Sequence, residues 1–100
     1  MLTSAIDRLV ALGLTEHEAT VYMVLLEDHR STAPQVSECS GIPLSRISSV
    51  LTGLEDRGAV VSSNGNGTRM YTAVPATEFL ERVRQDYRDL IAGLRDKLAT

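Results

Sequence analysis

The chain lacks tryptophan, has a single cysteine, Cys39, and has no run of 18 or more apolar residues. One cysteine can form no disulfide within the chain and no cysteine-based metal site. Without a long apolar run, no membrane-spanning helix is expected. The first 14 residues lack a basic start and carry Asp7 and Arg8 inside the apolar segment, so they do not resemble a secretory signal. We therefore expect a cytoplasmic protein with no membrane partner.

Groups that could support catalysis are also few. His17 and His29 lie far apart in the sequence with no metal-ligand pattern between them, and both are expected at the surface. The acidic residues are spread along the predicted helices, as on solvated faces. Cys39 is predicted to be a packing residue, with a redox switch as the alternative, because free cysteines are usually buried. We expect no enzyme, no bound metal and no cofactor.

The charge is mildly negative and unevenly distributed. The net charge is −3. Residues 1–43 contain six acidic and two basic residues, and residues 75–100 contain five of each. Residues 44–74 contain three arginines against two acidic residues, which makes this the one segment with a positive sum. Nonspecific coating of nucleic acid is not favoured by this balance, and a specific contact from the middle segment remains open.

The start and end signals of three helices are visible near the N-terminus of this single, mainly helical domain. Three capping-box patterns predict helix starts at Ser4 with Asp7, Thr15 with Glu18, and Thr32 with Gln35. The first helix is expected to run through Leu12 and stop at Gly13. The second should run to about Asp28. The third should bury Val36 and Cys39 and end at Gly41.

The stretch GIPLSRISSVLTGLEDRGAV, residues 41–60, predicts a fourth helix with two contrasting faces. Its apolar residues fall at i, i+3, i+4 and i+7, which places Ile47, Val50, Leu51 and Leu54 on one side. The opposite side carries small hydroxyl residues and one arginine: Ser45, Arg46, Ser48, Ser49 and Thr52. Two short helices separated by a tight glycine turn are typical of a helix-turn-helix, whose second helix enters the DNA major groove.

The pattern changes period after Gly58. AVVSS and RMYTAV predict two strands joined by NGNGT, a turn in which two glycines can take positive φ. Pro75 then precedes a long helix over residues 76–98 with a heptad-like apolar stripe. Such a stripe predicts a homodimer seam formed by Leu80, Val83, Tyr87, Leu90, Ile91, Leu94 and Leu98. The alternative is a helix that packs back on its own domain. The predicted fold is a winged helix-turn-helix over residues 1–75, followed by a C-terminal dimerisation helix over residues 76–100.

Several segments resemble one known family. LGLTEHEA, SGIPLSRI with VLTGLEDRGAV, and RMYTAVP are similar to the N-terminal domain of TrmB-type transcriptional regulators, winged-helix proteins common in archaea and related to the MarR and ArsR groups. The resemblance covers nearly the whole chain and implies a DNA-binding dimer. It places Ser45, Arg46, Ser48 and Ser49 in the recognition helix and Arg69 in the wing. Thr32, Gln35 and Thr52 complete the predicted DNA-binding set.

The sequence departs from the family pattern at two positions and at its end. Family members often have a basic residue at the position of Leu44 and an aromatic one at Ser48, so weaker DNA affinity is expected here. Full-length members carry a sugar-binding domain after the long helix, and sugar sensing is not expected of these 100 residues. Any small-molecule effector is left unidentified.

Three alternatives stay open. Arg69 either contacts DNA or pairs across the hairpin as a surface strand residue. Gly53, placed by the helical pattern on the outer side, either permits close approach to a phosphate or only weakens the helix. The protein as a whole is predicted to bind double-stranded DNA at an inverted-repeat operator. The alternative is a winged-helix protein-interaction or dimerisation module without strong DNA binding.

Overall fold

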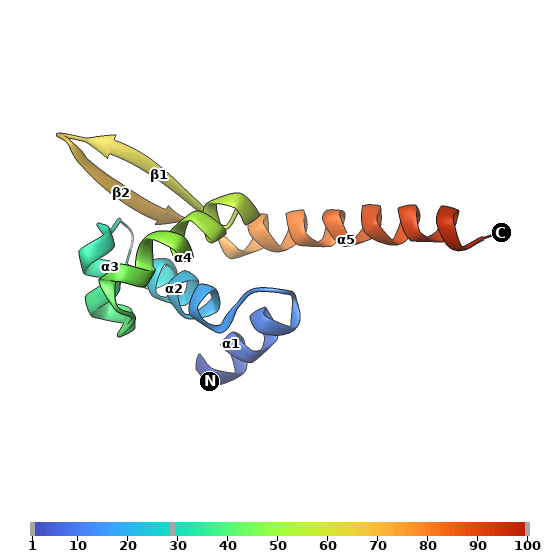
Figure 1. Cartoon of the computed structure of the whole chain (residues 1–100), viewed down its shortest axis with the longest axis horizontal. Coiled ribbons are helices and arrows are strands. Elements are labelled where there is room, and N and C mark those ends of the chain that lie inside the picture. Colours follow the sequence, from blue (N-terminus) through green and yellow to red (C-terminus); the bar gives the residue numbers. More distant parts are fainter. Residues whose placement is uncertain (1, 29, 100) are drawn as a thin grey trace.

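The computed structural model describes residues 2–28 and 30–99, and it has the predicted order of elements (Figure 1). His29, expected at the surface, lies outside the described residues, and His17 is exposed. The elements are α1 (Leu2–Ala11), α2 (Glu16–Glu27), α3 (Ala33–Ser40), α4 (Leu44–Arg57), β1 (Val60–Gly65), β2 (Thr68–Ala73) and α5 (Ala76–Leu98). This arrangement confirms the mainly helical winged helix-turn-helix fold with a long C-terminal helix.

Local signals account for most helix ends. The capping boxes at Thr15 and Thr32 are both formed, with the threonine and the residue three positions later bonding reciprocally. Gly41 and Gly58 end α3 and α4 in the left-handed conformation, with φ of 75° and 80°. The prediction at Ser4 was wrong, because α1 already begins at Leu2 and Ser4 lies within it. Asp7 also has a shorter side chain than Glu18 and Gln35, which complete the two capping boxes that do form.

The hydrophobic core lies between α2, α3, α4 and the start of α5. Tyr22 and Phe79 are almost fully buried, and their rings lie 5.1 Å apart at an interplanar angle of 57°. The Tyr22 hydroxyl donates to the Val74 carbonyl at 2.9 Å, and burial raises the pKa of Tyr22 to about 12. This tyrosine therefore stays protonated and ties α2 to the segment that leads into α5.

The two strands form an antiparallel hairpin with Val60 opposite Ala73 and Gly65 opposite Thr68. Its loop is Asn66-Gly67, with φ of 54° and 78°, as a two-residue type I′ turn requires. Of the two glycines that could take positive φ, Gly67 does so, whereas the other left-handed position of the turn is taken by Asn66. Ser31 adds a short bridge to Tyr71, with N···O distances of 3.1 and 2.8 Å.

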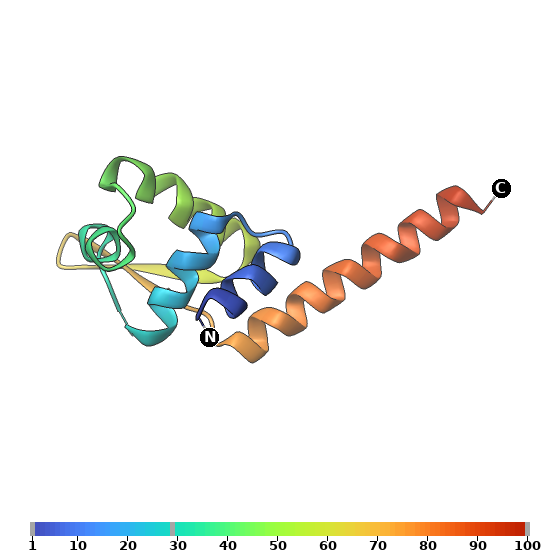
Figure 2. The same cartoon turned by 90° about the horizontal axis from the view of Figure 1, so that it is seen from below.

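The helix α5 contacts the rest of the molecule with its first half and extends away from it with its second half. Figures 1 and 2 show its second half extending alone, with no other element beside it in either view. Phe79 is buried and Val83 is partly buried against the core, whereas the later apolar residues are exposed. Within the described residues, no helix is both long enough and apolar enough to cross a bilayer.

Candidate nucleic-acid interface

The turn between α3 and α4 is held by bonds within it. The Ser37 hydroxyl donates to the Ile42 carbonyl at 2.6 Å, and the Ile42 N–H donates to the Ser40 hydroxyl oxygen at 3.2 Å. The Ile42 side chain is buried, which fixes the turn to the core. Pro43 then stands at the N-cap of α4 with φ of −56°. A turn fixed in this way gives α4 a defined direction relative to α3 and the core.

The helix α4 has the two faces that its sequence predicts. Ile47, Leu51 and Leu54 are fully buried and Val50 nearly so. The predicted DNA-contacting residues of this helix are all exposed: Ser45, Arg46, Ser48, Ser49 and Thr52. The outer face is therefore open to solvent along the whole helix.

Two hydroxyls of this face are bonded to the helix itself. Ser49 donates to the Arg46 carbonyl at 3.2 Å, and Thr52 donates to the Ser48 carbonyl at 2.9 Å. Such back-bonding uses the hydroxyl hydrogen and leaves the oxygen lone pairs as acceptors. Within the described residues, the hydroxyls of Ser45 and Ser48 make no hydrogen bond, so each can still both donate and accept one.

The two arginines of α4 have different surroundings. Arg57, in the last turn, donates from Nε to Glu18 Oε1 at 3.1 Å and from Nη2 to the Gly13 carbonyl at 2.7 Å. Arg46, near the start, is exposed and forms no ion pair with any described residue. Its guanidinium is thus available for an external anion or base edge.

The charge along α4 is also divided. The first turn contains no acidic residue, and both acids of the helix, Glu55 and Asp56, lie near its C-terminal end. The helix dipole adds partial positive charge at the N-terminal end. The half that carries Arg46 is therefore the more electropositive half, although the whole chain is acidic.

Thr32 and Gln35 are partly occupied by the capping box of α3. Thr32 N–H donates to Gln35 Oε1 at 2.9 Å, and Gln35 N–H donates to the Thr32 hydroxyl at 3.4 Å. Gln35 is exposed and its amide NH₂ is not used in these bonds, whereas Thr32 is half-buried. Of the two, Gln35 is the better placed to contact a partner.

Arg69 of the hairpin is engaged inside the chain. Its Nε and Nη2 donate to the Ser62 hydroxyl at 3.2 and 3.0 Å, and Nη2 lies 3.8 Å from Glu55 Oε2. Ser62 in turn donates to Glu55 at 3.1 Å. The structure thus contains the cross-hairpin pairing that was one of the two alternatives for this residue. The same bonds attach the hairpin to the C-terminal part of α4.

Two expectations near this surface are corrected. Gly53 does not face outward, because a Cβ added there would collide with the Glu18 carboxylate of α2. It permits the buried Glu18 to reach Arg57, a role that sequence reasoning missed because the two partners lie 39 positions apart. Cys39, predicted to be buried, is exposed. The short helix α3 buries Val36 and turns Cys39 outward.

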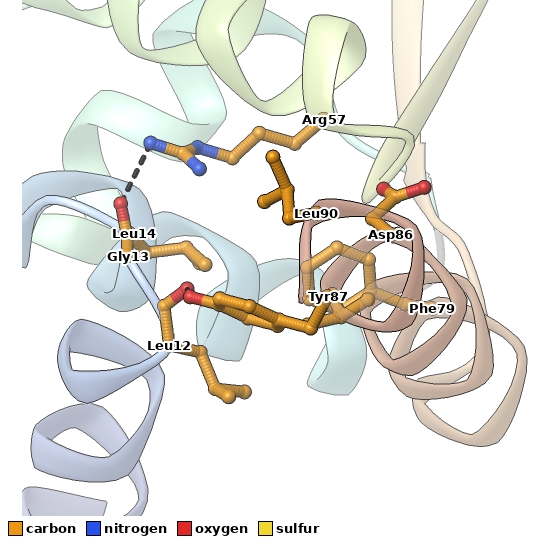
Figure 3. Close-up of a pocket in the computed structure, with 9 residues that line it drawn as sticks. Leu12, Gly13, Leu14, Arg57, Phe79, Asp86, Tyr87 and Leu90 are labelled. Carbon is orange, nitrogen blue, oxygen red and sulfur yellow. Dashed lines mark hydrogen bonds between the residues drawn. The ribbon is translucent and has the colours of Figure 1, made fainter. Parts of the chain in front are cut away.

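A cavity of about 250 Å³ lies where α4, α5 and the loop after α1 meet (Figure 3). In Figure 3, Arg57 and Tyr87 reach the same loop from two helices. Arg57 bonds the Gly13 carbonyl, and the Tyr87 hydroxyl donates to the Leu12 carbonyl at 2.6 Å. The loop therefore links the end of α4 to the middle of α5, and neither bond was predicted from the sequence.

These features define a winged helix-turn-helix protein whose second motif helix presents a polar, partly cationic surface. A sequence profile of the family described as sugar-specific transcriptional regulator TrmB matches residues 9–77. The chain belongs to this family of transcriptional regulators, as the resemblance in its sequence implied.

Two curated relatives show how much of such proteins the chain corresponds to. The uncharacterized protein YrhO of Bacillus subtilis is 39% identical over 84 residues, which are 84% of this chain and 30% of YrhO. The HTH-type sugar sensing transcriptional regulator TrmBL1 of Pyrococcus furiosus is 37% identical over 81 residues, which are 81% of this chain and 24% of TrmBL1. The chain thus spans about a quarter to a third of the length of these relatives, one bacterial and one archaeal.

Solved structures share the fold. TrmBL2, an archaeal chromatin protein with a novel mode of DNA binding, superposes with a TM-score of 0.91 at 23% identity, over 99% of this chain and 38% of TrmBL2. A possible transcriptional regulator from Methanosarcina mazei Go1 gives a TM-score of 0.74 at 15% identity, over 97% of this chain and 86% of that protein. At these identities the likeness concerns the fold.

Proposed function

We propose that this chain is a sequence-specific DNA-binding unit of a transcriptional regulator and that it binds double-stranded DNA as a homodimer in the cytoplasm. Residues 1–75 would contact the DNA, and α5 within residues 76–100 would hold the two copies together. The observation that carries the proposal is the outer face of α4, where Arg46 stands exposed and without an ion pair among the described residues. DNA binding by the related fold of TrmBL2 supports it.

The proposed binding mode follows from the arrangement of α4. Recognition helices insert their N-terminal residues into the major groove, and here that end carries Ser45, Arg46, Ser48 and Ser49. Arg46 can donate two bonds to guanine or clamp a phosphate, and the serine hydroxyls supply weaker contacts. Gln35 and Arg69 are proposed as secondary contacts, Arg69 only if it leaves its bonds to Ser62.

Dimer symmetry would repeat these contacts in an inverted-repeat site. The stripe on α5 supports the dimer, because Leu80, Leu90 and Leu94 are exposed and apolar. Val83 and Tyr87 already contact their own domain, so the proposed seam lies chiefly in the distal half of the helix. Ile91 and Leu98, both exposed, belong to that half.

The test begins with selection of binding sites from a random double-stranded DNA library at low salt. Affinity for the selected site is then measured by fluorescence anisotropy at several salt concentrations. We expect Arg46→Ala to weaken binding by about 1–3 kcal/mol per half-site if Arg46 reads a base, with relaxed preference at one position. If Arg46 holds a phosphate, all sequences weaken alike and the salt slope shrinks.

The matched control is Arg8→Ala, which removes an exposed arginine from α1 and should leave affinity unchanged. Failure to select any site, or equal binding by wild type, Arg46→Ala and Ser45→Glu/Ser49→Glu, would contradict DNA recognition by α4. The acidic net charge of −3 would then favour the alternative of a winged-helix module that binds protein.

A further inference from the structure

One large apolar side chain on α4 has no place in the core. Leu44, the first residue of the helix, is 51% exposed, although Ile42 before it and Ile47 after it are buried. Most of the other exposed large apolar residues belong to the stripe on α5. Leu44 does not, because it lies at the end of α4 away from α5 (Figure 1). The dimer stripe therefore does not include Leu44, and what sets Leu44 apart is its place at the N-terminal end of α4.

We infer that Leu44 contacts the 5-methyl group of a thymine in the major groove and thereby selects a T·A pair at one position of each half-site. This inference rests on the proposed function and specifies which base the start of α4 recognises. The thymine methyl is the apolar group that B-DNA presents in its major groove. An exposed leucine at the inserting end of a recognition helix matches that group in chemistry and in position.

The neighbouring side chains strengthen this assignment. The hydroxyls of Ser49 and Thr52 donate to carbonyls of the helix backbone. They can therefore accept hydrogen bonds from base edges but have no hydrogen left to donate to them. Arg46 is the one cation in the first half of the helix, and its guanidinium suits guanine or phosphate.

The position of Leu44 directly after the fixed turn also favours the proposed thymine contact. The fixed turn at Ser37, Ile42 and Pro43 directly precedes it, so its Cα is held by the core although its side chain is free. A side chain placed in this way loses little backbone freedom on binding. Contact with one methyl buries about the area of one CH₂ group, worth about 0.8 kcal/mol or roughly fourfold in affinity. If both half-sites of a dimer make this contact, the two gains multiply to roughly fifteenfold in affinity.

The experiment replaces each thymine of the selected site with deoxyuridine, which removes the 5-methyl group and keeps base pairing. We expect one thymine in each half-site at which this replacement weakens wild-type binding roughly fourfold. With Leu44→Ala, uracil and thymine at that position should bind equally. Val61→Ala is the matched control, because Val61 is a similarly exposed aliphatic residue of β1, at 56%, and it should keep the wild-type difference.

A second arm restores the methyl group in a different base. The sensitive T·A pair is replaced by C·G, with or without a 5-methyl on the cytosine. Wild type should bind the methylated form several-fold more tightly than the unmethylated form, and Leu44→Ala should not distinguish them. Circular dichroism and thermal melting of Leu44→Ala should match wild type, because the residue lies outside the core.

The results separate the two proposals. If wild type binds a selected site and Arg46→Ala weakens it, but no thymine is sensitive to deoxyuridine, the assignment of Leu44 is overturned and DNA recognition by α4 stands. The assignment is also overturned if Leu44→Ala keeps the full uracil effect. If wild type binds no DNA at all, the proposed function itself fails, and the thymine contact fails with it.

Discussion

The outer faces of α4 and α5 are both open to solvent, but they differ in chemistry. The face of α4 presents short hydroxyl side chains and Arg46, with Leu44 at its tip. The face of α5 presents large apolar side chains, of which Leu90 is 60% and Leu98 is 77% exposed. A polar face suits a hydrated, charged partner, whereas an apolar stripe of this size favours removal from water.

The two helices also differ in how they are anchored. Four buried residues and the Arg57 bonds hold α4 along its length. Among the described residues, α5 is held by its first half alone, through Phe79, Val83 and the Tyr87 hydroxyl. The comparison implies that α4 is a preformed surface and that the distal half of α5 gains its tertiary contacts from a second copy.

The largest effect is expected on α5. The Leu90→Asp/Leu94→Asp variant should be monomeric in light scattering, because each leucine buried in a dimer contributes roughly 1.5–3 kcal/mol. Its DNA affinity should fall by orders of magnitude, since two half-sites are no longer linked. The control Gln85→Asp/Ala92→Asp places the same charges on the other side of α5 and should remain dimeric. A wild type that is monomeric at tens of micromolar would contradict the proposed dimer seam.

An intermediate effect is expected from the two arginines of α4. Arg57→Ala should lower the free energy of unfolding by about 1–3 kcal/mol, because it leaves the buried Glu18 without its cation and frees the Gly13 carbonyl. Arg46→Ala should change it by less than about 0.5 kcal/mol, since that side chain is exposed. Urea unfolding of both variants measures the difference. A loss for Arg46→Ala as large as that expected for Arg57→Ala would mean that Arg46 is structural, whereas no loss for Arg57→Ala would mean that its bonds do not stabilise the fold.

Local sequence signals predicted the fold well because they act over a few residues. The threonine capping boxes and the left-handed glycines Gly41 and Gly58 place helix ends without reference to the rest of the chain. The apolar period of α4 likewise predicted its buried side. The failure at Ser4 shows the limit of such signals, because a similar spacing also occurs inside a helix.

Contacts distant in sequence could not be predicted in this way. Nothing near Gly53 reveals that α2 brings Glu18 against it, and nothing near Tyr87 reveals the Leu12 carbonyl 75 positions earlier. The exposed hydroxyls and Arg46 were predicted from helical spacing. The pairing of Arg69 with Ser62 depends on the strand register, and the sequence left it as one of two alternatives.

The smallest effect is expected at Cys39, which lies outside both surfaces. Because its side chain is exposed, Cys39→Ala should change the free energy of unfolding by less than about 0.5 kcal/mol and leave DNA affinity unchanged. Partial desolvation and the neighbouring Asp28 carboxylate raise the pKa of the Cys39 thiol above its ordinary value. The thiolate is the reactive form, so alkylation by iodoacetamide should be slow at neutral pH and speed up only as the pH rises through this raised pKa. Mild oxidation should therefore leave DNA binding of wild type and Cys39→Ala alike. Rapid alkylation at neutral pH, together with loss of wild-type binding on oxidation, would instead make Cys39 a redox sensor.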